Sequence, residues 1–215
     1  MKRHEEPFIR KIESYCSGKD VLEIGCGDGK RSREVAGSSK SWIGIDPDAE
    51  SVQAANEVAA MPDTEFLQGS AEDLKWPEAT FDVVMFTLSL HHIDINTMPA
   101  AIGEGIRVLR PGGLIVFLEP MPVGTFFDAE MSFRCCDGDE RRELAYANFT
   151  MLNAVRLTEV EEYIDEVSVE YDSFEDFTTH VPTKEGTHVQ LEQFLADREF
   201  TLNEKFRMNV FQVAG

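Results

Sequence analysis

The segment "VLEIGCGDGK", residues 21–30, sets three glycines at alternate positions directly behind a short apolar run. Because glycine has no Cβ, a turn of glycines at a strand end lets backbone amides come close to a ligand. The spacing does not fit the phosphate-binding loop GxxxxGK[ST], since Arg31 stands where that loop has a hydroxyl. It does not fit the dinucleotide fingerprint GxGxxG either, since Lys30 stands where the third glycine belongs.

Short apolar runs alternate with segments of helical spacing over the first 120 residues. The runs are rich in β-branched and aromatic residues, which predicts strands. They are residues 20–25, 41–46, 64–69, 81–90 and 113–120. Strands that alternate with helices predict right-handed crossovers and a mostly parallel sheet, so the predicted fold class is α/β.

Residues 200–214 carry a different pattern. Two runs of alternating apolar and polar residues flank Asn203, Glu204 and Lys205, which predicts an antiparallel hairpin at the end of the sheet. The segment 187–199 before them has helical spacing and predicts the last crossover helix.

Residues 121–182 form an insertion that is too long for a plain loop. They contain a predicted helix at 139–156 and a short predicted strand at 166–174. Insertions over the carboxyl edge of a parallel sheet lie where such folds bind ligands. We therefore expect a single domain spanning residues 1–215, within which residues 121–182 form a substrate lid.

Charge and hydropathy limit the partners. The chain has 40 Asp plus Glu against 20 Lys plus Arg, a net charge of −20 that repels a phosphate backbone, so we expect no nucleic-acid partner. No apolar run reaches the roughly 20 residues of a membrane-spanning helix, and residues 1–11 lack the apolar core of a signal peptide. We expect a cytoplasmic protein without membrane insertion, either a monomer or a homodimer.

The cysteines do not predict a metal site. Cys16, Cys26, Cys135 and Cys136 form neither a CxxC pair nor a zinc-site spacing. We expect reduced thiols and no metal ion.

Together these motifs make the sequence resemble the class I S-adenosylmethionine-dependent methyltransferases, whose first motif is E/D-x-G-x-G-x-G. That motif is residues 23–29 here, and "IGIDPD" at 43–48, "GSAEDL" at 69–74 and "RVLRPGGLIVFLEP" at 107–120 follow in order. The resemblance covers roughly residues 18–120 plus the C-terminal hairpin. It implies a Rossmann-like, mostly parallel sheet of seven strands and S-adenosylmethionine as cofactor.

The resemblance also implies a set of cofactor contacts. Asp46 is expected to accept the ribose hydroxyls, although an Asp before Pro47 could instead form a turn. Glu23 is expected to accept hydrogen bonds from loop amides or to reach the ligand's ammonium, because an unpaired carboxylate in an apolar strand is costly. The predicted cofactor-binding residues are Glu23, Gly25, Cys26, Gly27, Asp46, Pro47, Ser70, Ala71, Glu72 and Thr87.

One of these positions departs from the family. Ser70 and Ala71 would lie beside the adenine, but the commoner family residue at position 70 is Asp. Glu72 or Asp73 could replace that carboxylate, or either could cap a helix.

The stretch "FTLSLHHID", residues 86–94, contains the candidate catalytic residues His91 and His92. Near neutral pH a histidine can take the proton of a nucleophile during methyl transfer. In quinone and sugar methyltransferases of the family, such a sequence lines the active site with an acid from the fifth strand, which is Glu119 here. Either histidine could instead be a structural cap at the strand end.

The predicted reaction is methyl transfer to an O, N, C or S atom of a small molecule. A first alternative is an oxidoreductase that binds NAD at the same turn, which Lys30 disfavours. A second is a module that binds S-adenosylmethionine without catalysis. The intact Gly25, Gly27 and Asp46 argue against loss of the ligand but do not establish turnover.

Overall fold

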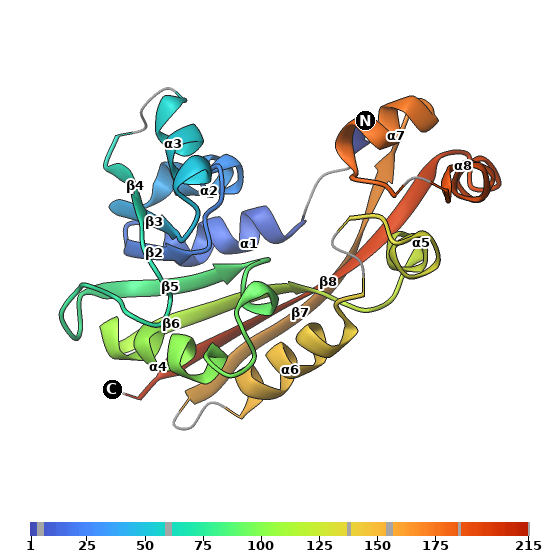
Figure 1. The fold of residues 1–215 in the computed structure, drawn as a ribbon. Coiled ribbons are helices and arrows are strands. Elements are labelled where there is room, and N and C mark those ends of the chain that lie inside the picture. The colour runs from blue at the N-terminus through green and yellow to red at the C-terminus, as the bar shows by residue number, and fades with distance from the viewer. Residues whose placement is uncertain (4–6, 59–61, 137–138, 154–156, 185, 215) are drawn as a thin grey trace.

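The computed structural model describes residues 1–3, 7–58, 62–136, 139–153, 157–184 and 186–214 (Figure 1). One mixed sheet runs through them, in the order β1-β7-β8-β6-β5-β2-β3-β4. Its strands are β1 (Lys2–Arg3), β2 (Asp20–Ile24), β3 (Ser41–Asp46), β4 (Thr64–Gln68), β5 (Phe81–Thr87), β6 (Leu109–Pro120), β7 (Leu157–Glu170) and β8 (Thr201–Val213). Seven long strands and the two-residue β1 confirm the α/β class.

The sheet is parallel where the chain alternates strands with helices. β2 pairs in parallel with β3 and β5, β3 with β4, and β5 with β6. β8 is antiparallel to both β6 and β7. The carboxyl ends of β2, β3, β5 and β6 therefore meet along one edge, where parallel sheets bind ligands.

Helices cover both faces of the parallel part (Figure 1). Their bounds are α1 (Pro7–Cys16), α2 (Lys30–Val35), η1 (Ala36–Ser38), α3 (Ala49–Glu57), η2 (Leu90–His92), α4 (Met98–Val108), α5 (Thr125–Phe133), α6 (Arg141–Leu152), α7 (Phe174–His180) and α8 (His188–Ala196), where η marks a 3-10 turn. Alternate residues of β5 face opposite layers. Val84 and Phe86 pack with α4 and α6, whereas Val83 and Met85 pack with α1.

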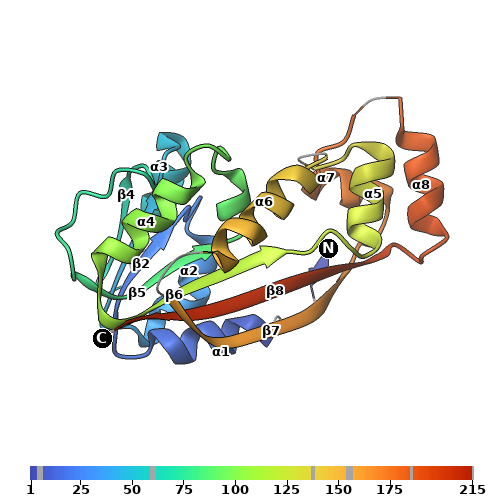
Figure 2. The same ribbon diagram turned by 90° about the horizontal axis from the view of Figure 1, so that it is seen from below.

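A separate small core lies where β7 and β8 extend beyond the other strands (Figure 2). Ala129 of α5, Phe177 of α7, and Leu191 of α8 pack there against the ends of the two strands, and all three are fully buried. The predicted helix at 187–199 is α8.

The predicted turn at Asn203–Lys205 is wrong, although the antiparallel C-terminal strands are confirmed. Residues 201–213 form one strand, β8, which pairs along its whole length with β7. The antiparallel partners are thus β7 and β8, and α7 and α8 connect them. Alternation shows which residues share a face of a strand, but it does not show whether the strand is interrupted.

The predicted lid, residues 121–182, has two kinds of structure. It contains the helices α5, α6 and α7, and it also contains β7, a strand of the central sheet. The predicted helix at 139–156 is α6, up to residue 152, and residues 154–156 lie outside the described part of the chain. The predicted strand at 166–174 is the end of a much longer β7.

The small core of α5, α7 and α8 gives a stability prediction. Leu191→Ala should lower the free energy of unfolding by about 2–5 kcal/mol, because it leaves a cavity among fully buried side chains. Val189→Ala is the control on the same helix, since Val189 is 78% exposed, and it should change stability by less than about 0.5 kcal/mol. If urea denaturation gave the same loss of unfolding free energy for both variants, burial of Leu191 in this core would contribute nothing specific to stability.

Candidate active site

The glycine turn connects β2 to α2 at the carboxyl edge of the sheet. Gly25, Gly27 and Gly29 have φ angles of +79°, +52° and +68°, which glycine adopts without strain. A Cβ on Gly25 would lie 2.3 Å from the Cβ of Ser89, so no side chain fits there. A Cβ on Gly27 would meet nothing within 4 Å, so the turn is open on that side.

Asp46 holds this turn from the end of β3. Its Oδ2 accepts a hydrogen bond of 2.8 Å from the Gly27 amide, and its Oδ1 accepts one of 2.9 Å from the Asp48 amide. A carboxylate has about four lone-pair sites, so two acceptor positions are left for a ligand. Asp46 thus lies beside the glycine turn, and its hydrogen bond from the Asp48 amide forms the turn around Pro47 that the sequence offered as the alternative.

Glu23 lies under the turn and is 1% exposed. Its carboxylate accepts hydrogen bonds from the hydroxyls of Ser32 and Thr87 and from the Trp42 indole at 3.3 Å. Burial raises the pKa of the Glu23 carboxyl. Side chains of α2, β3 and β5 thus provide the donors, whereas the sequence predicted loop amides or the ligand's ammonium.

The Cys26 side chain points into the protein. It packs with Val52, Ala55 and Phe66, and burial raises the pKa of its thiol. Its backbone amide donates to the Ile45 carbonyl at 3.0 Å. The predicted reduced thiol fits this environment.

Two cavities border the glycine turn on either side of Gly25. The first, here the turn cavity, has a volume of about 300 Å³. It is lined by Ile24, Gly25, Ile45, Pro47, Gly69, Ser70, Ala71, Glu72, Ser89, His92, Ile93 and Asp94. Pro47 and the 70–72 segment were predicted to lie together here, but Ser89, Ile93 and Asp94 were not predicted.

Glu72 is held at the rim of the turn cavity. It accepts hydrogen bonds from the Ser70 hydroxyl and, at 2.8 Å, from the Thr97 hydroxyl. The Ser70 hydrogen bond lowers the pKa of the Glu72 carboxyl. A carboxylate is thus present beside position 70, where the family more often has Asp.

The second cavity, here the Glu23 cavity, has a volume of about 370 Å³. It is lined by Met1, Glu23, Gly25, Cys26, Gly27, Asp28, Lys30, Arg31, Glu34 and Thr87. Thr87 was predicted to lie here, whereas the cations Lys30 and Arg31 were not assigned a binding role. The sequence signal that could have identified these two cations is their position directly after the glycine motif.

His91 and Glu119 form a buried pair at the ends of β5 and β6. They are 4% and 3% exposed, and the His91 Nδ1 is hydrogen-bonded to the Glu119 carboxylate. The other Glu119 oxygen accepts a 3.0 Å hydrogen bond from the Leu90 amide. In the neutral imidazole this contact keeps the proton on Nδ1 and leaves Nε2 as an acceptor. The structure thus brings two predicted catalytic residues together.

His92 and Glu140 complete the cluster. His92 Nδ1 lies 3.4 Å from one Glu140 oxygen, and His91 Nε2 lies 3.7 Å from the other. The two imidazole rings are 4.1 Å apart between centroids. The His92 hydrogen bond lowers the pKa of the Glu140 carboxyl. Glu140, the residue before α6, was not predicted, because it is distant in sequence and no motif marks it.

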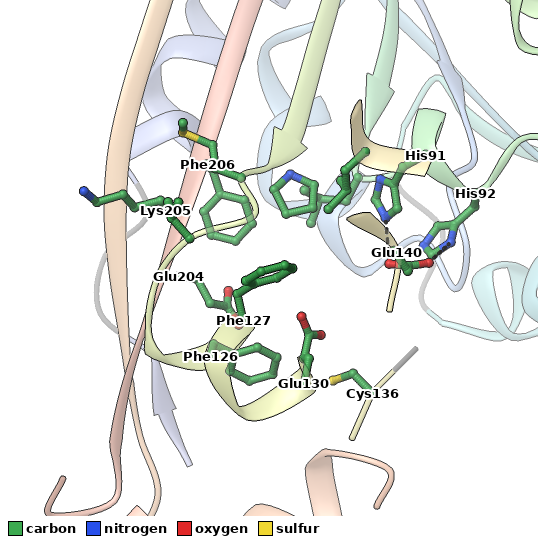
Figure 3. Close-up of a pocket in the computed structure, with 15 residues that line it drawn as sticks. His91, His92, Phe126, Phe127, Glu130, Cys136, Glu140, Glu204, Lys205 and Phe206 are labelled. Atoms are coloured by element: carbon green, nitrogen blue, oxygen red, sulfur yellow. Dashed lines mark ion pairs between the residues drawn. The ribbon is translucent and has the colours of Figure 1, made fainter. Parts of the chain in front are cut away.

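A third cavity of about 270 Å³, here the lid cavity, lies between this cluster and the helices α5 and α6 (Figure 3). Its walls are mostly apolar, with carboxylates and one lysine among them. They are Leu88, His91, His92, Pro120, Met121, Val123, Phe126, Phe127, Glu130, Cys136, Glu140, Leu144, Glu204, Lys205 and Phe206. His92 lines both the lid cavity and the turn cavity.

Comparison with known proteins finds similarity to methyltransferases. Residues 21–113 match a family described as a methyltransferase domain. Over 119 residues the chain is 34% identical to a probable S-adenosylmethionine-dependent methyltransferase of Mycolicibacterium smegmatis, covering 55% of this chain and 44% of that protein. It is 31% identical to the 27-O-demethylrifamycin SV methyltransferase of Amycolatopsis mediterranei, and this match covers 76% of this chain and 58% of that protein.

A solved structure shares the fold across nearly the whole chain. A putative methyltransferase from Bacillus halodurans superimposes with a TM-score of 0.69 at 14% identity, covering 96% of this chain and 99% of that one. Over residues 21–113 the chain is therefore similar to S-adenosylmethionine-dependent methyltransferases, and it shares its fold with the solved structure. It matches about half the length of the two curated relatives. Within the described residues, no helix is both long and apolar enough to span a bilayer.

Asp46 gives a prediction for the cofactor site. Asp46→Ala should weaken the binding of S-adenosylhomocysteine by about 1–3 kcal/mol, since it removes a charged acceptor and the partner of the Gly27 amide. Isothermal titration calorimetry measures this change. Asp197→Ala, at the end of α8 and away from the turn, is the control and should bind as the wild type does. Unchanged affinity in Asp46→Ala would remove Asp46 from the ligand site.

Proposed function

We propose that this chain transfers the methyl group of S-adenosylmethionine to a hydroxyl oxygen of a small apolar molecule. The observation that carries the proposal is the position of the histidine pair. His92 lines both the turn cavity and the lid cavity, and His91 lies beside it with a carboxylate on Nδ1. The histidine pair thus lies between a nucleoside-sized cavity and an apolar one, with His91, the proton acceptor, in the wall of the apolar cavity.

The residues at the glycine turn fit the chemistry of the cofactor. Apolar side chains of the turn cavity, such as Ile45 and Ala71, suit an adenine ring, and the remaining lone pairs of Asp46 suit a ribose diol. Lys30 and Arg31 in the Glu23 cavity suit an amino-acid carboxylate. S-adenosylmethionine supplies a methyl group on a positively charged sulfur, which is a good leaving group, so the protein mainly has to align the acceptor.

The buried pair would remove the proton of the acceptor. The hydroxyl proton moves to His91 Nε2 as the oxygen–carbon bond forms and the sulfur–carbon bond breaks. Glu119 keeps the imidazole oriented through Nδ1 and offsets the positive charge that His91 gains. The products are a methyl ether and a neutral thioether, with the proton on His91.

The lid cavity supports an apolar hydroxyl compound as acceptor. Phe126, Phe127 and Phe206 offer apolar contact area, whereas the carboxylates of Glu130 and Glu204 disfavour a negatively charged acceptor. The Amycolatopsis relative is named for a 27-O-demethyl substrate, which is consistent with transfer to oxygen. Residues 121–182 would then contribute most of the acceptor specificity.

Calorimetry with three ligands tests the cofactor. We expect binding of S-adenosylmethionine and S-adenosylhomocysteine and none of NAD, because Lys30 stands in place of the third glycine of the dinucleotide fingerprint. Binding of NAD alone would establish the oxidoreductase alternative. If the chain bound S-adenosylmethionine and S-adenosylhomocysteine but methylated no apolar hydroxyl compound, the alternative of a binding module without catalysis would be favoured.

The buried pair gives a kinetic prediction. His91→Ala and Glu119→Gln should each lower kcat, His91→Ala by about 10²–10⁴-fold, since general-base catalysis contributes on that scale. Affinity for S-adenosylhomocysteine should stay within about two-fold in Glu119→Gln, because Glu119 lines neither the turn cavity nor the Glu23 cavity. Full activity of His91→Ala on an identified acceptor would contradict the proton-transfer role.

A further inference from the structure

We propose that His91, His92 and Glu140 bind one divalent transition-metal ion at the wall of the lid cavity. Figure 3 shows the two imidazoles and the carboxylate directed toward one another. The proposal goes beyond methyl transfer, because binding of an ion requires neither the cofactor nor an acceptor.

Two of the three distances between ligand atoms in the cluster are close to those of metal ligands. Glu140 oxygens lie 3.4 Å from His92 Nδ1 and 3.7 Å from His91 Nε2. Ligand atoms on a tetrahedral zinc ion, with bonds of about 2.0–2.1 Å, lie roughly 3.3 Å apart. In the ion-free chain the 3.4 Å distance corresponds to a long hydrogen bond between His92 and Glu140. All three ligand atoms lie within 4.8 Å of one another, so a small closure around an ion is sufficient.

The ligand types suit a first-row transition metal. Two imidazoles and one carboxylate hold catalytic zinc in metalloproteases and iron in facial-triad sites, with further positions open. Oxygen-only ligands would instead favour Mg²⁺ or Ca²⁺. Because all three residues line the lid cavity, the open positions would face the acceptor.

Glu119 provides the support that such a site needs. A metal-bound histidine usually donates its other ring N–H to a carboxylate or a carbonyl, which fixes the tautomer and the ring orientation. His91 has this arrangement, with Nδ1 on the buried Glu119 and Nε2 toward Glu140. The Leu90 amide in turn donates a 3.0 Å hydrogen bond to Glu119, so the group that orients His91 is itself held in place.

The surroundings also favour a cation. The chain carries a net charge of −20, and Glu130 and Glu204 line the same cavity. The ion and the acceptor proton would compete for the same lone pair on His91 Nε2. His91 is therefore the proton acceptor in the metal-free chain, and a ligand in the metal-loaded chain.

The test is a titration of the untagged chain with Zn²⁺, in the absence of cofactor and acceptor. We expect one Zn²⁺ per chain by calorimetry, and His92→Ala and Glu140→Gln should each weaken binding by about ten-fold or more. Glu119→Gln, which touches no ion directly, should weaken it by about 10–100-fold, as loss of an outer carboxylate does. Co²⁺ in place of Zn²⁺ should give a visible absorption spectrum that Glu140→Gln changes.

His188→Ala is the matched control, because it removes a histidine of α8 outside the cluster. It should leave the stoichiometry and the affinity unchanged. His92 is 52% exposed by its side chain and Glu140 25%, so their variants should fold, and circular dichroism checks this. No uptake of Zn²⁺ by the wild type, or equal uptake by the double variant His92→Ala/Glu140→Gln, would overturn the proposal. Failure to bind S-adenosylmethionine would overturn only the proposed function.

Discussion

The buried carboxylate of Glu23 is the constraint on which the site depends. It lies in the central strand β2 and is 1% exposed, where an unpaired charge would cost several kcal/mol. Ser32 from α2, Trp42 from β3 and Thr87 from β5 donate to it. Four elements are therefore fixed around one side chain, and the glycine turn, which joins two of them, takes its position from that arrangement.

Two further carboxylates repeat this construction at the sheet edge. Asp46 ends β3 and accepts from the Gly27 amide of the neighbouring turn, and Glu119 at the end of β6 accepts from the Leu90 amide. Each adds a side-chain hydrogen bond to a loop that follows a strand. The ligand-facing groups thus rest on strand ends, which position side chains more accurately than free loops do. This rigidity suits a reaction that depends on alignment.

Periodicity and motif spacing in the sequence predicted the main strands and several residues of the candidate site. The parallel strands, the glycine turn, Asp46 at the next strand end, and His91 and Glu119 at the same sheet edge follow from short apolar runs and from the family resemblance. The prediction of an interrupted C-terminal strand was wrong, because Asn203 and the two residues after it are polar residues of a continuous strand and do not form a turn. Glu140 was missed because tertiary packing alone brings α6 to η2, and the Glu23 donors were missed for the same reason.

The helices over the site differ in how firmly they are attached. Ala147 and Met151 of α6 belong to the main core with α4, and Asn148 accepts a 3.1 Å hydrogen bond from Arg207 of β8. Glu140, directly before α6, therefore has a fixed place beside the histidines. The helix α5 instead packs into the separate core with α7 and α8. Under the proposed function, changes in the apolar wall that α5 contributes to the lid cavity would therefore alter acceptor choice without disturbing the histidine cluster.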